Sequence, residues 1–204
     1  MARIEKDFLG EKELPDSAYY GVQTLRGKEN FHITGIPMSA EPYFVKAIGY
    51  VKKAAALANR DLGVLDARVA DAIVGACDRL IAGEMCDQFV TDFIQGGAGT
   101  STNMNANEVI ANLALESLGH KKGEYQFVNP NDHVNFGQST NDIYPTAFRL
   151  ALILRLASYM DALRRLQDAF YAKGKEFGRV LKMGRTHLQD AVPMSLGQEF
   201  HGWG

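Results

Sequence analysis

Three segments of the chain place hydroxyl, amide or imidazole side chains directly after a glycine. The first is GGAGTSTN, residues 96–103, in which three glycines lead into Thr100, Ser101 and Thr102. An apolar helical pattern follows, so the free N–H groups of a helix N-terminus and several hydroxyl donors are expected at one point, which suits a small anion such as a carboxylate. The alternative is that these hydroxyls only cap the helix.

Nucleotide binding by this glycine-rich loop is excluded on residue type. A Walker A loop needs lysine directly after its last glycine, and Gly99 is followed by Thr100. The dinucleotide fingerprint fails at its third glycine position, which Thr102 occupies, and no strand pattern precedes the loop.

A second segment, PNDHVNFGQSTND at residues 130–142, repeats the arrangement. Gly137 precedes four potential donors at the expected start of another helix: Gln138, Ser139, Thr140 and Asn141. A single such segment could be a helix cap, but two of the same design indicate a binding site.

The third segment, GRTHLQD at residues 184–190, places Arg185, Thr186 and His187 after a glycine. Histidine is the residue type that most readily exchanges protons near neutral pH. No HExxH or similar ligand spacing accompanies it, so neither a metal nor another cofactor is expected.

The elements that must position these segments are mainly helices. Apolar periodicity predicts helices over residues 42–62 and, after a cap at Asp66, over 67–82. A third is expected after the glycine loop, with one buried stripe: Ala106, Val109, Ile110, Leu113 and Ala114. A long helix should begin near Ile143, with Pro145 in its first turn.

Only Arg149, Arg155 and Ser158 interrupt the apolar stretch 148–160 of that long helix, which predicts burial within a bundle. The Val and Ile runs of a parallel sheet are absent. We therefore expect a mainly α fold with an N-terminal domain over residues 1–140 and the start of a central helical-bundle domain over 141–204.

Composition limits the partners. The 204 residues include 24 acidic and 22 basic side chains without a basic block, which argues against nucleic acid. No run approaches a membrane span, and the first residues lack the apolar core of a signal peptide, so a cytoplasmic protein is expected. The two cysteines, Cys77 and Cys86, are interpreted as ordinary thiols. A small molecule and other subunits remain the expected partners.

Together the three segments resemble the signature regions of the aspartase and fumarase superfamily of lyases. The matching stretches are GTSTNMNANEVIAN, NDHVN followed by QSTND, and GRTHLQDAVP with LGQEF, in the expected order. Within the superfamily, PDSAYYGVQTLR, ENFHITG and the Ser-Thr-Asn triplet are more similar to the aspartate ammonia-lyase branch than to class II fumarases.

The resemblance implies a lyase that reversibly deaminates L-aspartate to fumarate and ammonia through an enediolate-like intermediate. By residue, it implies that Ser139, Thr140 and Thr186 hold the reacting carboxylate, while Thr100, Asn141 and His187 surround the amino group. It also implies a homotetramer whose active sites combine signatures from different subunits.

The same resemblance places the general base on a serine loop, GSSxMPxKxNP, that residues 1–204 do not contain. On that ground the chain is expected to be the N-terminal portion of an enzyme and to be inactive alone, with the apolar surface of its long helix facing water. Two other hypotheses stay open: a class II fumarate hydratase, and a non-catalytic helical module in which the three segments are only caps.

Overall fold

The computed structural model describes residues 2–204. The chain forms two compact units, of which the first extends to Leu154 and the second comprises Arg155–Gly204. The fold is mainly α, as expected, although each unit also contains one two-stranded antiparallel hairpin. This division by compactness does not address the domain boundary expected at residues 140 and 141, which stays a prediction.

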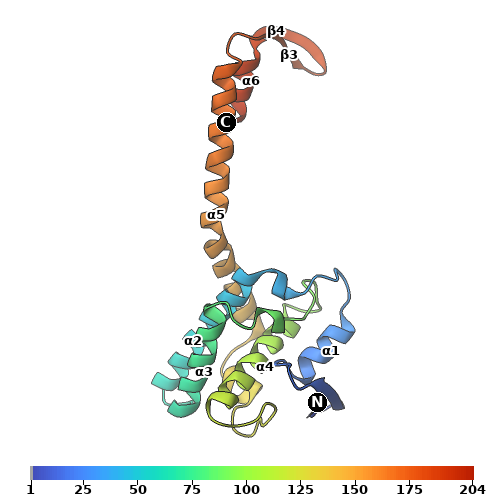
Figure 1. Ribbon diagram of the computed structural model, residues 1–204, viewed down its shortest axis with the longest axis vertical. Helices are drawn as coiled ribbons and strands as arrows, with labels where there is room; N and C mark the ends of the chain where they lie inside the picture. Colours follow the sequence, from blue (N-terminus) through green and yellow to red (C-terminus); the bar gives the residue numbers. More distant parts are fainter. Residues whose placement is uncertain (1) are drawn as a thin grey trace. The chain divides into compact units, whose positions relative to one another are not determined.

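The first unit is shown in the lower part of Figure 1. Its elements in chain order are β1 (Ala2–Asp7), β2 (Gly10–Pro15), α1 (Val22–Asn30), η1 (Met38–Ala40), α2 (Pro42–Asp61), α3 (Ala67–Ile81), η2 (Cys86–Gln88), α4 (Thr100–Ser117), η3 (Pro130–Val134) and the first part of α5 (Thr140–Glu176).

Helices α2 and α3 lie side by side, and their bounds confirm the two helices expected from apolar periodicity (Figure 1). Gly63 ends the first with a left-handed φ of 70°, a conformation that glycine adopts without steric cost. The Asp66 carboxylate begins the second by accepting the Val69 N–H at 3.1 Å. Local capping chemistry therefore sets both boundaries.

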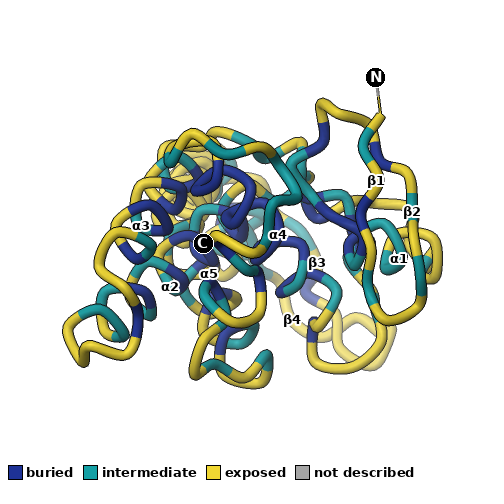
Figure 2. The backbone as a smooth tube through the Cα atoms, turned by 90° about the horizontal axis from the view of Figure 1, so that it is seen from below, coloured by how far each residue is buried: buried dark blue, intermediate teal, exposed yellow. Residues whose placement is uncertain are grey.

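Helix α4 is the centre of the first unit. The expected apolar stripe is buried, but so are polar side chains on its other faces: Asn103, Asn105, Asn107, Glu108 and Asn112. Figure 2 shows α4 as a mostly buried segment. Helices α1, α3 and η3 all contact it. Most of these buried polar groups find protein partners, which organise the surrounding loops, although Asn103 Oδ1 and Asn107 Oδ1 have none within residues 2–204.

One of these buried groups, Glu108, completes the N-terminus of α1. The preceding residue, Gly21, has no side chain to cap that helix. Instead the Glu108 carboxylate accepts the backbone N–H groups of Gly21 at 2.8 Å, Gln23 at 2.9 Å and Thr24 at 3.0 Å. Burial raises the pKa of Glu108, while these hydrogen bonds act to lower it. Helix α1 was not expected from the sequence because its cap comes from a distant residue.

Helix α5 begins at Thr140 rather than near Ile143. Pro145 is therefore inside the helix and not in its first turn, so the expectation for its position was wrong. Most large apolar side chains of the stretch 148–160 are exposed, with exposed fractions from 39% for Met160 to 65% for Ile153, whereas Ala151 is buried and Leu150 and Leu154 are half-buried. The chain alone does not supply the expected bundle, and the expected exposed apolar surface is confirmed.

The second unit contains the end of α5, the hairpin β3 (Leu181–Thr186) and β4 (Gln189–Ser195), and α6 (Leu196–Trp203). Aromatic rings from α5, the following turn and α6 pack together: Phe170, Phe177, Phe200 and Trp203. Ser195 begins α6 with a capping box, in which Ser195 and Gln198 bond reciprocally. Neither the hairpin nor α6 was predicted from the sequence.

Among residues 2–204, no helix is long and apolar enough to cross a membrane, and no group of three His, Cys, Asp or Glu side chains could hold a metal ion. Both cysteines are free thiols. Burial raises the pKa of Cys77 to about 12, so this thiol stays protonated.

Candidate active site

The glycine-rich loop reaches α4 through Gly99, which has a left-handed φ of 92° and forms no side-chain cap. Gln95 supplies the cap instead, because its Oε1 accepts the Thr102 N–H at 2.7 Å. The Thr102 hydroxyl is turned inward and bonds with Thr91 at 3.1 Å. The capping hypothesis is therefore wrong for Thr100, whose hydroxyl is not used at this helix terminus.

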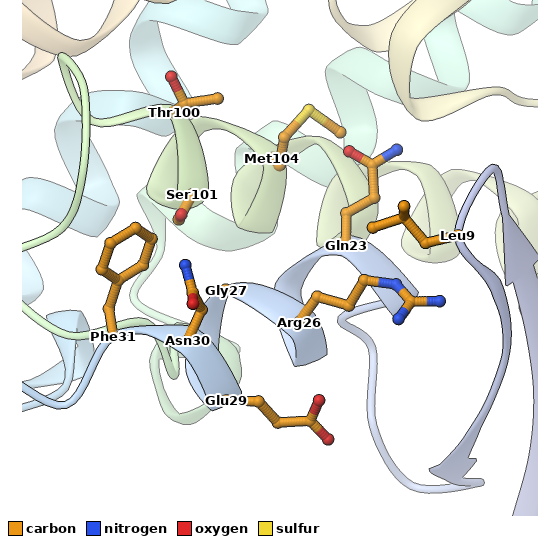
Figure 3. Close-up of a pocket in the computed structure, with 10 residues that line it drawn as sticks. All are labelled: Leu9, Gln23, Arg26, Gly27, Glu29, Asn30, Phe31, Thr100, Ser101 and Met104. Atoms are coloured by element: carbon orange, nitrogen blue, oxygen red, sulfur yellow. The ribbon is translucent and has the colours of Figure 1, made fainter.

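Thr100 and Ser101 border a depression of about 570 Å³ between α1 and the first turn of α4. In Figure 3, the two side chains extend from that turn in different directions, Ser101 toward α1. The two helices are close here, since a Cβ added to Gly27 would lie 3.1 Å from Ser101 Cβ. Thr100 is exposed, so its hydroxyl is accessible from outside the unit.

The second segment begins α5 with hydroxyl groups that act as acceptors. Ser139 Oγ accepts the Asn141 N–H at 3.2 Å, and Thr140 Oγ1 accepts from Asn103 Nδ2 at 3.0 Å. Ser139 is thus a helix cap, as the alternative hypothesis holds. Each hydroxyl still carries a hydrogen, and within residues 2–204 neither is recorded as donating it. Both groups remain available as donors to a ligand.

The structure brings these two segments together. The Asn103–Thr140 hydrogen bond joins α4 to α5, and Gly99 lies so close to Tyr144 that a Cβ at residue 99 would overlap the ring. Asn141 and the glycine loop line a common depression of about 310 Å³. Its border also includes Pro145, which has no N–H to donate to the Asn141 carbonyl inside the helix. The glycine loop and the start of α5 therefore meet at one surface, which Asn141 borders, whereas Thr100 lines the separate depression beside α1.

Thr186 and His187 belong to the second unit. Thr186 ends β3 and pairs with Gln189, and the two residues between them form the hairpin turn. Both turn residues, His187 and Leu188, are left-handed, with φ of 51° and 62°. This conformation suits a two-residue hairpin but is uncommon for residues other than glycine and asparagine. His187 is exposed at the tip of this hairpin.

A buried lysine beneath the start of α5 was missed at the level of sequence. Lys52 is 0% exposed, and its Nζ donates to Asn135 Oδ1 at 2.8 Å and to Gln138 Oε1 at 3.0 Å. Gln138 Nε2 donates to Val134 O at 2.9 Å and to Phe136 O at 3.3 Å, so both hydrogens of its NH₂ group are used within the protein and the expectation that its side chain offers a donor to a ligand is wrong. Helical spacing is the signal that could have found Lys52, because it falls on the same face of α2 as Val45, Ile48 and Ala56.

This buried lysine predicts a pH dependence of stability. Burial lowers the pKa of Lys52 to about 7 from the usual 10.5. The unfolded chain therefore binds the proton more tightly than the folded protein, and unfolding takes up a proton between about pH 7 and 10.5. We expect the free energy of unfolding to rise with pH across this window relative to a Lys52→Met variant, as measured by urea denaturation at several pH values.

Lys53→Met is the matched control, because Lys53 is the next residue of α2 and reaches solvent beside Asp78. Wild type and Lys53→Met should keep the same dependence of stability on pH. Equal slopes for wild type and Lys52→Met would contradict the prediction.

The chain is similar to known lyases in sequence. A family model described as Lyase matches residues 10–204. The aspartate ammonia-lyase of Helicobacter pylori strain J99 is 60% identical over 198 residues, which cover 97% of this chain and 42% of that protein. The aspartate ammonia-lyase of Escherichia coli K12 is 56% identical over 202 residues, covering 98% of this chain and 42% of that protein.

The chain is also similar to solved structures of lyases. A fumarate lyase:delta crystallin from Brucella melitensis, in native form, has a TM-score of 0.91 and 56% identity, and covers 100% of this chain and 47% of that one. A class II fumarase from Schistosoma mansoni has a TM-score of 0.85 and 40% identity, covering 100% and 43%. The chain thus spans less than half the length of these relatives.

Proposed function

Since the chain belongs to the lyase family whose model matches residues 10–204, we propose that the product of its complete reading frame converts L-aspartate reversibly to fumarate and ammonia. One observation of the structure carries the proposal. The N-termini of α4 and α5 lie together and present hydroxyl groups whose hydrogens are not spent on capping. The names of the sequence relatives support aspartate as the substrate.

The reaction requires what these helix termini offer. A base removes a proton from the carbon beside the side-chain carboxylate, and the electron pair moves into that carboxylate, which becomes an enediolate carrying two negative charges. The pair then returns to form the carbon–carbon double bond as the bond to the amino group breaks and ammonia leaves. Donors already fixed in place stabilise the doubly charged intermediate without reorganising, and each contributes about 2.7 to 4 kcal/mol.

We assign three donors to the reacting carboxylate: Ser139, which precedes α5, Thr140, which begins α5, and Thr186 from a β3–β4 hairpin. Thr100, Asn141 and His187 are assigned to the amino group. Support for Asn141 comes from its place beside the glycine loop and from its carbonyl, which Pro145 leaves without a helical donor. The group that removes the proton is not among the residues assigned here.

We also propose a cytoplasmic homotetramer in which different subunits contribute Thr140 and His187 to one site. The exposed apolar residues of α5 support association: Phe148, Leu152, Ile153, Leu156, Tyr159, Met160, Leu163 and Leu166. A continuous apolar face of this kind is typical of helices that pack against other subunits.

A direct assay tests the proposed reaction. The product of the complete reading frame is incubated with L-aspartate, and fumarate is followed by its ultraviolet absorbance. In the reverse direction, fumarate with ammonium should yield aspartate, whereas fumarate in buffer without ammonium should persist. If malate forms from fumarate in the buffer without ammonium, and no ammonia is released from aspartate, the enzyme is instead a fumarate hydratase.

A further inference from the structure

A continuous chain of buried and half-buried polar groups connects α2 to the first residue of α5. Lys52 Nζ donates to Asn135 Oδ1 at 2.8 Å. The same oxygen accepts from Asn103 Nδ2 at 3.1 Å, and that nitrogen also donates to Thr140 Oγ1 at 3.0 Å. Lys52 and Asn103 are 0% and 1% exposed, whereas Asn135 and Thr140 are half-buried. Water is therefore excluded from the Lys52 and Asn103 ends of these hydrogen bonds.

The direction of every hydrogen bond in this chain follows from Lys52. An ammonium group can only donate, and a neutral amine still carries two N–H groups for its two acceptors, Asn135 and Gln138. Asn135 must therefore turn its oxygen toward Lys52. The opposite end of its amide agrees with this orientation, because Asn135 Nδ2 donates to the Gln138 carbonyl at 3.1 Å.

The orientation of Asn103 follows in turn. Because Asn135 presents an oxygen, Asn103 must present its NH₂ group, and the same nitrogen faces Thr140 Oγ1. Thr140 is thereby an acceptor toward the protein, so its own hydrogen has to point elsewhere. Reversing the Asn103 amide would let Thr140 donate inward, but it would set two oxygens against each other at Asn135.

We infer that Asn103 is a positioning residue, which holds the Thr140 hydroxyl as a hydrogen-bond donor directed at the reacting carboxylate of the substrate. This inference rests on the proposed function, in which Thr140 contacts that carboxylate. Asn103 itself acts only through Thr140, since its NH₂ group is occupied by Asn135 and Thr140.

The substitution Asn103→Asp tests the direction of the hydrogen bond with almost no change of shape. A carboxylate replaces the NH₂ group with an acceptor, so the Thr140 hydroxyl turns to donate inward and is lost to the substrate. The same oxygen also faces Asn135 Oδ1, a contact that is unfavourable whether or not Thr140 is present. We expect kcat for aspartate deamination to fall about tenfold to a hundredfold, with a much smaller change in KM. Asn107→Asp is the matched control, because Asn107 is equally buried on α4 and does not contact Thr140.

A double-mutant cycle separates this role from a general effect on the fold. In a Thr140→Ala background the hydroxyl is gone, so Asn103→Asp should lower kcat less than about threefold further. If Asn103 had only a structural role, Asn103→Asp would lower kcat equally with and without Thr140, which would overturn the inference. An unchanged kcat in the Asn103→Asp single variant would overturn it as well. If Asn103→Asp does not fold, Asn103→Ala is measured in the same cycle. We then expect a smaller loss of kcat when Thr140 is present and no further loss in the Thr140→Ala variant.

The outcomes also distinguish the inference from the proposed function. A wild-type enzyme that deaminates aspartate while Asn103→Asp retains full kcat would overturn the inference alone. A wild-type enzyme that hydrates fumarate instead would overturn the proposed reaction, and the same cycle on hydration would still test Asn103, because the carboxylate chemistry is shared. A protein without either activity would overturn both.

Discussion

Replacing Thr140 with alanine is expected to lower kcat for aspartate deamination by about a hundredfold to a thousandfold, the effect of losing one donor to a developing negative charge. KM should change far less, because the second charge on the carboxylate exists only near the transition state. The measurement is steady-state kinetics on the product of the complete reading frame, wild type and variant.

Thr146→Ala provides the control, since Thr146 is an exposed threonine on the same helix. It should leave both kinetic constants close to wild type. A Thr140→Ala enzyme with normal kcat and only a raised KM would show that Thr140 binds substrate and intermediate equally, which contradicts its assigned role.

Gly99→Ala is expected to be the most damaging small substitution in the loops around the site. The new methyl group would overlap the Tyr144 ring, and the left-handed φ of 92° is itself unfavourable for alanine. We expect a loss of at least about 2 kcal/mol in the free energy of unfolding, together with loss of activity as the N-termini of α4 and α5 separate. Urea denaturation and the deamination assay measure the two effects.

Gly97→Ala separates the two causes. Its φ of 70° is also left-handed, but a Cβ there meets only Thr100 Oγ1, at an ordinary 3.5 Å. Gly97→Ala should therefore lower the free energy of unfolding by only about 1 to 2 kcal/mol, which is what the left-handed backbone conformation costs an alanine. Adding Tyr144→Ala to Gly99→Ala should recover part of the lost stability. Equal losses for both glycine variants would mean that contact with Tyr144 contributes nothing.

The sequence by itself determined the features that depend on neighbouring residues. The cap at Asp66 and the left-handed Gly63 set the ends of α2 and α3, because each acts on backbone groups a few residues away. The three signature segments likewise identified the lyase family. Strands β1 and β3 were not predicted, because short strands rich in charged residues lack a clear apolar alternation.

Tertiary structure alone decided which partner each buried polar residue meets. Lys52 and Lys53 are adjacent and chemically identical, yet the first is buried against Asn135 and the second meets Asp78 at the surface. Asn135 is 83 positions from Lys52 in the chain, and Thr140 is 37 positions from Asn103.

Helix caps were readable from the sequence because their partners are fixed by helical geometry within one turn. The direction in which the Thr140 hydroxyl donates could not be read from the sequence, because it depends on Lys52, Asn135 and Asn103. These residues from three separate segments meet only when α2, α4 and the start of α5 pack together. The packing also removes the water that would otherwise satisfy Lys52 and Asn103 independently.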